Sequence, residues 1–192
     1  MKIKDNFLKQ EDFDKLQELM MGPYFNWYFW DRYYHTSYHA PTIQNGVTKV
    51  FTGKPAGEPT KTELDKFQFL HPFYESNQPV SSQLEHLDCI LQLIQPNAIV
   101  KIRANLLTRL PNIVENPFHT DLQDWPEEKQ KQWKTSIFYV NTNNGYTILE
   151  DGTKVESVAN RMLTFPTNMK HTGTSCTDKQ TRIIINFNYY TL

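Results

Sequence analysis

The second half of this 192-residue chain consists of short alternating segments separated by turns, and this pattern restricts the fold more than any other feature. Residues 98–107 place apolar side chains on one face and Lys101, Arg103 and Asn105 on the other, which is typical of a half-buried strand. Further strands are predicted at residues 135–141, 146–150, 162–165 and 181–190. Asn-Thr-Asn-Asn-Gly145 and Asp151-Gly152 are turn signals between them. Strands this short predict a sandwich or barrel, and we expect a mainly β (α+β) jelly-roll-like barrel.

The first half is expected to be helical and irregular and to support that barrel. Helices are predicted at residues 11–20, where Gly22-Pro23 ends the pattern, and from Ser82, where Ser82 and Glu85 match a capping box. Residues 24–38 are rich in aromatic residues, as expected for core or for part of a substrate cleft. Residues 52–60 resemble an exposed loop. Without a convincing linker, we expect one domain over residues 1–192, with 1–97 as support and substrate side and 98–192 as the barrel.

His119-Thr120-Asp121 is the first candidate metal-binding element. The composition of 6 His and 21 acidic residues gives about 0.7 chance matches to His-x-Asp/Glu. A second copy, His86-Leu87-Asp88, lies in the predicted helix, where residues two apart point away from each other. Residues 118–122 lack a helical pattern, and in an extended segment the side chains of His119 and Asp121 share one face. The first copy is therefore the candidate.

His171 and Arg182 complete the candidate site. His171 follows the predicted strand 162–165, so a barrel can return it to His119 and Asp121. Two imidazoles and one carboxylate can bind one face of a ferrous ion and leave the opposite positions open. Arg182 opens the next strand, where a buried cation needs an anionic partner. A guanidinium can hold the far carboxylate of 2-oxoglutarate as a bidentate fork.

For other polar residues, a role in this site is less strongly indicated by the sequence. Tyr139, on the strand 135–141, can donate a hydrogen bond to the same carboxylate, although a core tyrosine is an equal alternative. Asn105 is a candidate cosubstrate ligand, and a solvent-facing strand explains it equally well; Lys101 is expected to be solvated. His35 and His39 have the i, i+4 spacing of helical metal ligands but no third ligand, which favours packing at the edge of the aromatic segment.

Charge and cysteine content limit the partners and the compartment. A net charge of −1 and a pI near 6.6 disfavour nucleic acid and anionic membranes as partners. Two cysteines are too few for a secreted disulfide scaffold and suit a reducing compartment. No signal peptide or membrane-spanning run is visible. We expect a soluble protein of the cytoplasm.

Several motifs together resemble the Fe(II)/2-oxoglutarate-dependent oxygenase superfamily, most closely its prolyl-4-hydroxylase-like branch, over roughly residues 98–192. They are His119-x-Asp121, the Phe-Tyr-Val-Asn run ending at Asn141, residues 160–166, His171 and residues 182–187. The chain also resembles small phage-encoded members, and if it is phage-encoded the expected location is the host cytoplasm. The resemblance implies a double-stranded β-helix with His119, Asp121 and His171 as iron ligands. It implies 2-oxoglutarate on Arg182, assisted by Tyr139, O2 as co-reactant, and allows ascorbate as a reductant.

The resemblance implies hydroxylation of a peptidyl, prolyl-like or small-molecule substrate, with decarboxylation of 2-oxoglutarate to succinate and CO2. No residue specifies that substrate or the oligomeric state. The alternative is a non-catalytic metal-binding barrel, either a binding protein or a virion-associated structural protein, which would not need the cation of Arg182. A cupin-type metal enzyme without a cosubstrate is a third hypothesis, but a fourth metal ligand at suitable spacing is not evident in the sequence.

Overall fold

The computed structural model describes residues 1–30, 42–44, 47–49 and 67–192. Within these ranges an eight-stranded antiparallel sheet has the order β1-β11-β8-β13-β7-β5-β2, with β6 paired to β5. Its strands are β1 (Lys2–Lys4), β2 (Tyr28–Trp30), β5 (Gln68–Glu75), β6 (Gln78–Pro79), β7 (Ala98–Thr108), β8 (Lys134–Tyr139), β11 (Arg161–Pro166) and β13 (Thr181–Tyr190).

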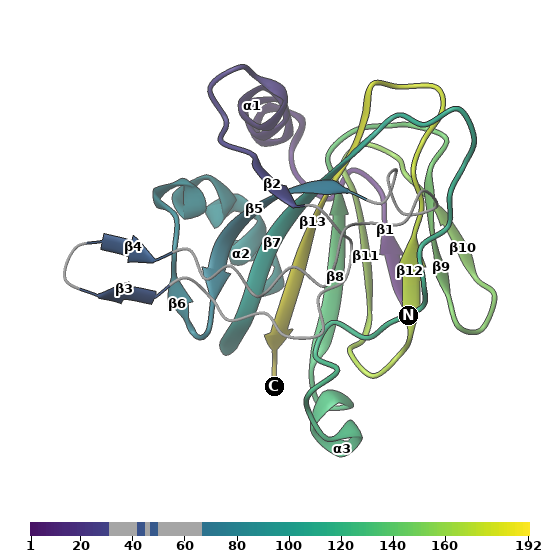
Figure 1. Ribbon diagram of the computed structural model, residues 1–192. Coiled ribbons are helices and arrows are strands. Elements are labelled where there is room, and N and C mark those ends of the chain that lie inside the picture. Colours follow the sequence, from purple (N-terminus) through teal and green to yellow (C-terminus); the bar gives the residue numbers. More distant parts are fainter. Residues whose placement is uncertain (31–41, 45–46, 50–66) are drawn as a thin grey trace.

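Two smaller sheets and four helical segments complete the described structure. A three-stranded sheet has the order β10-β9-β12, and β3 pairs with β4. Their bounds are β9 (Tyr146–Leu149), β10 (Lys154–Glu156), β12 (His171–Gly173), β3 (Thr42–Gln44) and β4 (Val47–Lys49). The helical segments are α1 (Gln10–Met21), the 3-10 helix η1 (Ser82–Leu87), α2 (Asp88–Ile94) and α3 (Glu127–Gln130). In Figure 1, α3 lies at the opposite end of the large sheet from α1.

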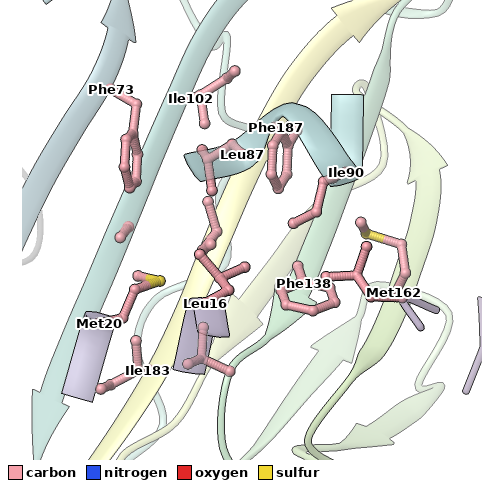
Figure 2. Close-up of a cluster of buried hydrophobic side chains, with 14 of the residues drawn as sticks. Leu16, Met20, Phe73, Leu87, Ile90, Ile102, Phe138, Met162, Ile183 and Phe187 are labelled. Carbon is pink, nitrogen blue, oxygen red and sulfur yellow. The ribbon is translucent and has the colours of Figure 1, made fainter. Parts of the chain in front are cut away.

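One face of the large sheet packs against the N-terminal helices. Alternation along β13 turns Ile183, Ile185 and Phe187 to this face, where they meet Leu16 and Met20 of α1. Leu87 and Ile90 cover the same apolar layer, as Figure 2 shows. Figure 2 also shows Phe138 and Met162, which come from β8 and β11, in this cluster. The helices therefore close one side of the sheet and leave the other face for the site.

A second core joins the opposite face of the large sheet to the small sheet. It contains Ile137, Tyr139, Leu149, Val155, Leu163, Phe165 and Ile184. These residues come from β8, β11 and β13 of the large sheet and from β9 and β10 of the small sheet. The two facing antiparallel sheets, with few helices, form a jelly-roll-like double-stranded β-helix, which confirms the predicted fold class.

The first half departs from its predicted irregularity at β5, an eight-residue strand between β7 and β2. The strand was not predicted because it contains Pro72. Proline has no backbone N–H to donate to a neighbouring strand and is rare in central strands. The register between β5 and β7 shifts between Pro72 and Tyr74, so the proline lies at an irregularity. The capping-box prediction was also wrong. Ser81, not Ser82, is the N-cap and accepts a hydrogen bond from the Gln83 amide, and the first turns are a 3-10 helix.

Other predictions fall partly outside the described residues. His35, His39 and the loop at residues 52–60 lie there entirely. Of the aromatic stretch, Phe25 is buried, Trp30 lines a cavity, and Tyr24 and Phe29 are exposed. In the described part of the chain, every helix is too short or too polar to traverse a bilayer.

Candidate metal centre

The metal centre is built on the second face of the large sheet, where three rows of side chains cross β7, β13 and β8. Backbone register places Lys101, Asn188 and Thr135 in one row, Arg103, Asn186 and Ile137 in the next, and Asn105, Ile184 and Tyr139 in the third. Directly opposed residues of antiparallel strands turn their side chains to the same face. Arg182 continues this face beside Leu107. The polar residues predicted on one face of each strand thus converge in the fold.

His119 and His171 face each other across an isolated antiparallel bridge. The His119 amide donates to the His171 carbonyl at 3.0 Å, and the His171 amide donates to the His119 carbonyl at 2.9 Å. Asp121 lies two residues beyond His119, so an extended chain returns its side chain to the same side. The Nε2 atoms of His119 and His171 lie 3.7 and 3.9 Å from Asp121 Oδ1.

These three residues offer ligand atoms that all lie within 4.8 Å of one another. In the described ranges, no other group of three His, Cys, Asp or Glu side chains is arranged to hold a metal ion. His86 lies in η1 and Asp88 begins α2, and both residues are exposed. Two imidazoles and one carboxylate on one side of a shared centre fit the facial ligand set of Fe(II) oxygenases.

The surroundings of Asp121 and His171 favour the protonation states in which a carboxylate and an imidazole bind a cation. Burial alone would raise the pKa of Asp121, but Lys101, both histidines and a hydrogen bond from Asn188 outweigh it and hold that pKa well below its usual range. Burial lowers the pKa of His171 to about 4, against the opposing pull of Asp121. At neutral pH the carboxylate is therefore ionised and the His171 imidazole neutral, which are the forms that bind metals.

Asn188 fixes the orientation of the Asp121 carboxylate. Its Nδ2 donates to Asp121 Oδ2 at 2.9 Å and to Thr135 Oγ1 at 3.0 Å. Because Oδ2 accepts from Asn188, Oδ1 is the oxygen that remains directed to the two imidazoles. Asn188 thus favours one carboxylate oxygen as the metal ligand.

Replacement of Asn188 by alanine is expected to weaken divalent-metal binding by about 10- to 100-fold, the usual cost of losing such a supporting contact. Calorimetric titration with Mn(II) measures the loss. Asn144→Ala, which removes hydrogen bonds from an exposed loop, is the control. Unchanged metal affinity in Asn188→Ala would show that Asp121 keeps its orientation without this amide.

Arg182 lies at the other end of the same face. It is only 1% exposed, and burial lowers its pKa. Its Nε donates to Ser157 Oγ at 2.8 Å and its Nη2 to Thr147 Oγ1 at 3.2 Å. Neither partner is charged, and among the described residues no carboxylate forms an ion pair with it. A buried guanidinium of this kind indicates that an anion belongs beside it.

Two glycines provide the space around Arg182. A Cβ at Gly173 would lie 3.3 Å from Arg182 Nη1. A Cβ at Gly145 would lie 2.7 Å from Arg182 Cδ and 2.7 Å from the Ser175 carbonyl oxygen. The glycine of the predicted turn therefore also allows the arginine side chain to pack.

Tyr139 and Asn105 occupy different positions around Arg182. Tyr139 is fully buried with its ring 5.8 Å from the Arg182 guanidinium, and its hydroxyl donates to Thr147 Oγ1 at 2.9 Å. Tyr139 thus contacts the arginine and Thr147 and is not among the cavity-lining residues. Asn105 does line the cavity, in the same row as Ile184. The cosubstrate roles of Tyr139 and Asn105 remain predictions.

A single cavity of about 580 Å³ connects the three metal-ligand residues to Arg182. Ile137, Thr147, Gly173, Ile184 and Asn186 are among the residues that line it. Asn186 Oδ1 is buried without a hydrogen-bond partner in the described structure. The volume is in the range of small-molecule sites, and an unsatisfied acceptor in the wall is available to a ligand donor.

Lys101, Asn188, Thr147 and Ser157 were not predicted as site residues. Lys101 was expected to be solvated, but it lines the cavity and its Nζ donates to the Asp121 carbonyl oxygen at 3.2 Å. The alternation of residues 98–107 already placed Lys101 on the face of Asn105. Thr147 and Ser157 carry no comparable signal, because only the fold brings them to Arg182.

Sequence comparison gives no relative for this chain, since no family model and no curated protein matches it. Solved structures do match in fold. One is a prolyl hydroxylase from Trichoplax adhaerens in complex with a hypoxia inducible factor oxygen degradation domain peptide fragment, with a TM-score of 0.61 and 13% identity over 98% of this chain and 82% of that one. A Pseudomonas putida prolyl-4-hydroxylase matches with a TM-score of 0.52 and 11% identity over 99% and 92% of the two chains.

A third similar structure is the non-heme alpha ketoglutarate dependent epimerase SnoN from nogalamycin biosynthesis. Its TM-score is 0.57, with 11% identity over 97% of this chain and 76% of that one. At these identities the comparisons show a common fold. The chain has the fold of 2-oxoglutarate-Fe(II) oxygenases over nearly its whole length and combines that fold with a His-x-Asp…His group.

Proposed function

We propose that this protein is a non-haem iron oxygenase that uses 2-oxoglutarate as cosubstrate and hydroxylates a peptidyl or small-molecule substrate. The observation that carries the proposal is the position of Arg182, a buried cation without an acidic partner in the described structure, in the same cavity as three converged metal-ligand side chains. A metal site alone explains the triad, whereas a carboxylate-bearing cosubstrate explains both features.

Each residue of the site has a distinct role in this proposal. His119, Asp121 and His171 hold the metal on one side, and Asn188 orients the carboxylate. Arg182 binds the distal carboxylate, while Thr147 and Ser157 hold the guanidinium in place. The apolar side chains of Ile137 and Ile184 restrict water between the two ends. Bound iron and 2-oxoglutarate supply oxidation by O2, in which 2-oxoglutarate loses CO2 and becomes succinate while one oxygen atom enters succinate and the other a substrate C–H bond.

A peptide substrate is supported by one comparison, since the Trichoplax adhaerens prolyl hydroxylase is bound to a peptide fragment. The volume of the cavity also suits a small molecule. The net charge of −1 does not favour nucleic acid. We further propose that residues 1–192 act as one domain in the cytoplasm, with the first half contributing to the substrate side.

Anaerobic titration tests the proposed function. Fe(II) and 2-oxoglutarate together, but neither alone, are expected to produce a visible metal-to-ligand absorption band, because chelation through a 2-oxo acid needs open positions on the metal. His171→Ala should abolish the band, and His86→Ala, at an exposed position, should retain it. A wild-type protein that binds Fe(II) without developing the band contradicts the use of 2-oxoglutarate and favours the non-catalytic metal-binding barrel.

A further inference from the structure

A second cation, Lys101, lines the cavity near the metal ligands. It lies on β7 opposite Asn188, in the row that approaches Asp121. Its Nζ donates to the Asp121 carbonyl oxygen at 3.2 Å. An ammonium group has three N–H donors, and this is the one hydrogen bond that Lys101 forms in the described structure.

Two carboxylates of the described cavity wall, those of Glu75 and Asp121, are already engaged by other groups. Glu75 is 5% exposed and accepts from Arg103 Nε at 3.0 Å and from Arg103 Nη2 at 2.7 Å. Asp121 accepts from Asn188 through one oxygen and offers the other to a metal. Within the described residues, Lys101 therefore has no ion-pair partner.

Lys101 is too far along the sheet to share an anion with Arg182. Arg182 pairs with Leu107, six residues from Lys101 on the same strand. Six residues of a strand span about 20 Å. A cosubstrate carboxylate held by Arg182 therefore leaves Lys101 free to contact a different molecule.

The sum of the charges in the occupied cavity also indicates that an anionic group belongs beside Lys101. The charges of Arg103 and Glu75 balance each other as an ion pair, and Asp124, the third acidic residue among the described residues of the wall, is exposed to solvent. Among the described residues of the wall, a divalent metal with Asp121 and a dianionic cosubstrate with Arg182 leave one uncompensated positive charge, that of Lys101. A monoanionic group would neutralise it.

We propose that Lys101 binds a carboxylate of the prime substrate and so places the reacting C–H bond within a few bonds of that carboxylate. This proposal rests on the proposed function and narrows its substrate class to carboxylate-bearing molecules. The closeness of the two positions follows from Asp121, which contacts Lys101 through its main chain and supplies a metal ligand through its side chain. A free acid and an acidic peptide side chain both offer this chemistry, and the experiment separates them.

The test measures binding by calorimetry to the anaerobic Fe(II)–2-oxoglutarate complex. The probes are the common L-amino acids, each as free acid and as carboxamide, and the peptides Gly-Pro-Asp-Gly and Gly-Pro-Asn-Gly with blocked ends. At least one acid is expected to bind roughly 10- to 100-fold more tightly than its amide twin, the range for a hydrogen bond to a charged group. Lys101→Met should remove this preference, and Lys101→Arg should retain part of it. Lys179→Met, at an exposed loop position, is the matched control and should behave as wild type.

Each outcome supports or contradicts the proposal. If the protein prefers the acid over the amide among the free amino acids, the substrate is a small carboxylic acid. If this preference is confined to the peptides, the substrate is an acidic peptide. The proposal fails if the protein binds no acid more tightly than its amide, or if this preference persists in Lys101→Met. It also fails if Lys101→Met weakens the binding of 2-oxoglutarate as much as the loss of Arg182 does. Should wild type take up no 2-oxoglutarate, the proposed function fails, and the same probes on the Mn(II)-loaded protein test Lys101 separately.

Discussion

Replacement of Arg182 by methionine is expected to lower the affinity of the Fe(II)-loaded protein for 2-oxoglutarate by about 10²- to 10⁴-fold, because two hydrogen bonds to a charged carboxylate are lost together. Metal affinity should change little, since Arg182 lies at the other end of the cavity from the metal ligands. Anaerobic calorimetry with each ligand measures both quantities. Arg182→Lys keeps the charge but not the planar fork and should fall between wild type and Arg182→Met.

The stability of the ligand-free protein provides an independent measurement of the same residue. A buried cation without a counter-charge is costly, and methionine fills a comparable volume without that cost. Ligand-free Arg182→Met should therefore be at least as stable to urea as wild type, while 2-oxoglutarate should stabilise only wild type. Arg109→Met, at an exposed position, is the control. If Arg182→Met binds 2-oxoglutarate like wild type, another residue holds the distal carboxylate.

Local pattern was sufficient to predict the strands that carry the site. The alternation in residues 98–107 and 181–190 corresponds to β7 and β13, with the side chains facing as expected. Each of these strands separates a helix-covered face from a cavity face, so period-two patterning is strong there. β5 was missed because Pro72 breaks the pattern of a central strand, and its bulge becomes visible only in the pairing with β7.

The site residues also differ in whether local sequence pattern or long-range strand pairing determines their position. His119 and Asp121 were predictable from a two-residue spacing in an extended segment, and His171 from its place after a strand. Their supporting residues depend on register between strands far apart in the chain. Asn188 meets Asp121 only because β13 lies between β7 and β8, and Thr147 meets Arg182 only because the small sheet packs on the large one. Periodicity does not encode such pairings.

His171 should make the ligand-free protein less stable as the pH falls from about 6.5 to about 4. Burial lowers the pKa of His171 from 6.5 to about 4 in the folded state, so between these values the unfolded chain binds more protons than the folded one. The contribution is fully present above pH 6.5, is lost progressively down to about pH 4, and is constant below that. A shift of this size corresponds to about 3 kcal/mol of unfolding free energy.

Urea unfolding of wild type and His171→Gln across pH 4 to 7 measures this effect as a difference in slope. His71 also has a pKa lowered by burial and adds to the slope in both proteins, so the difference isolates His171. His86→Gln, at an exposed position, should retain the wild-type slope. Equal slopes for wild type and His171→Gln would mean that Asp121 stabilises a protonated His171 in the absence of metal. The neutral imidazole would then not be preformed, and metal binding near pH 6 would have to displace a proton from this histidine.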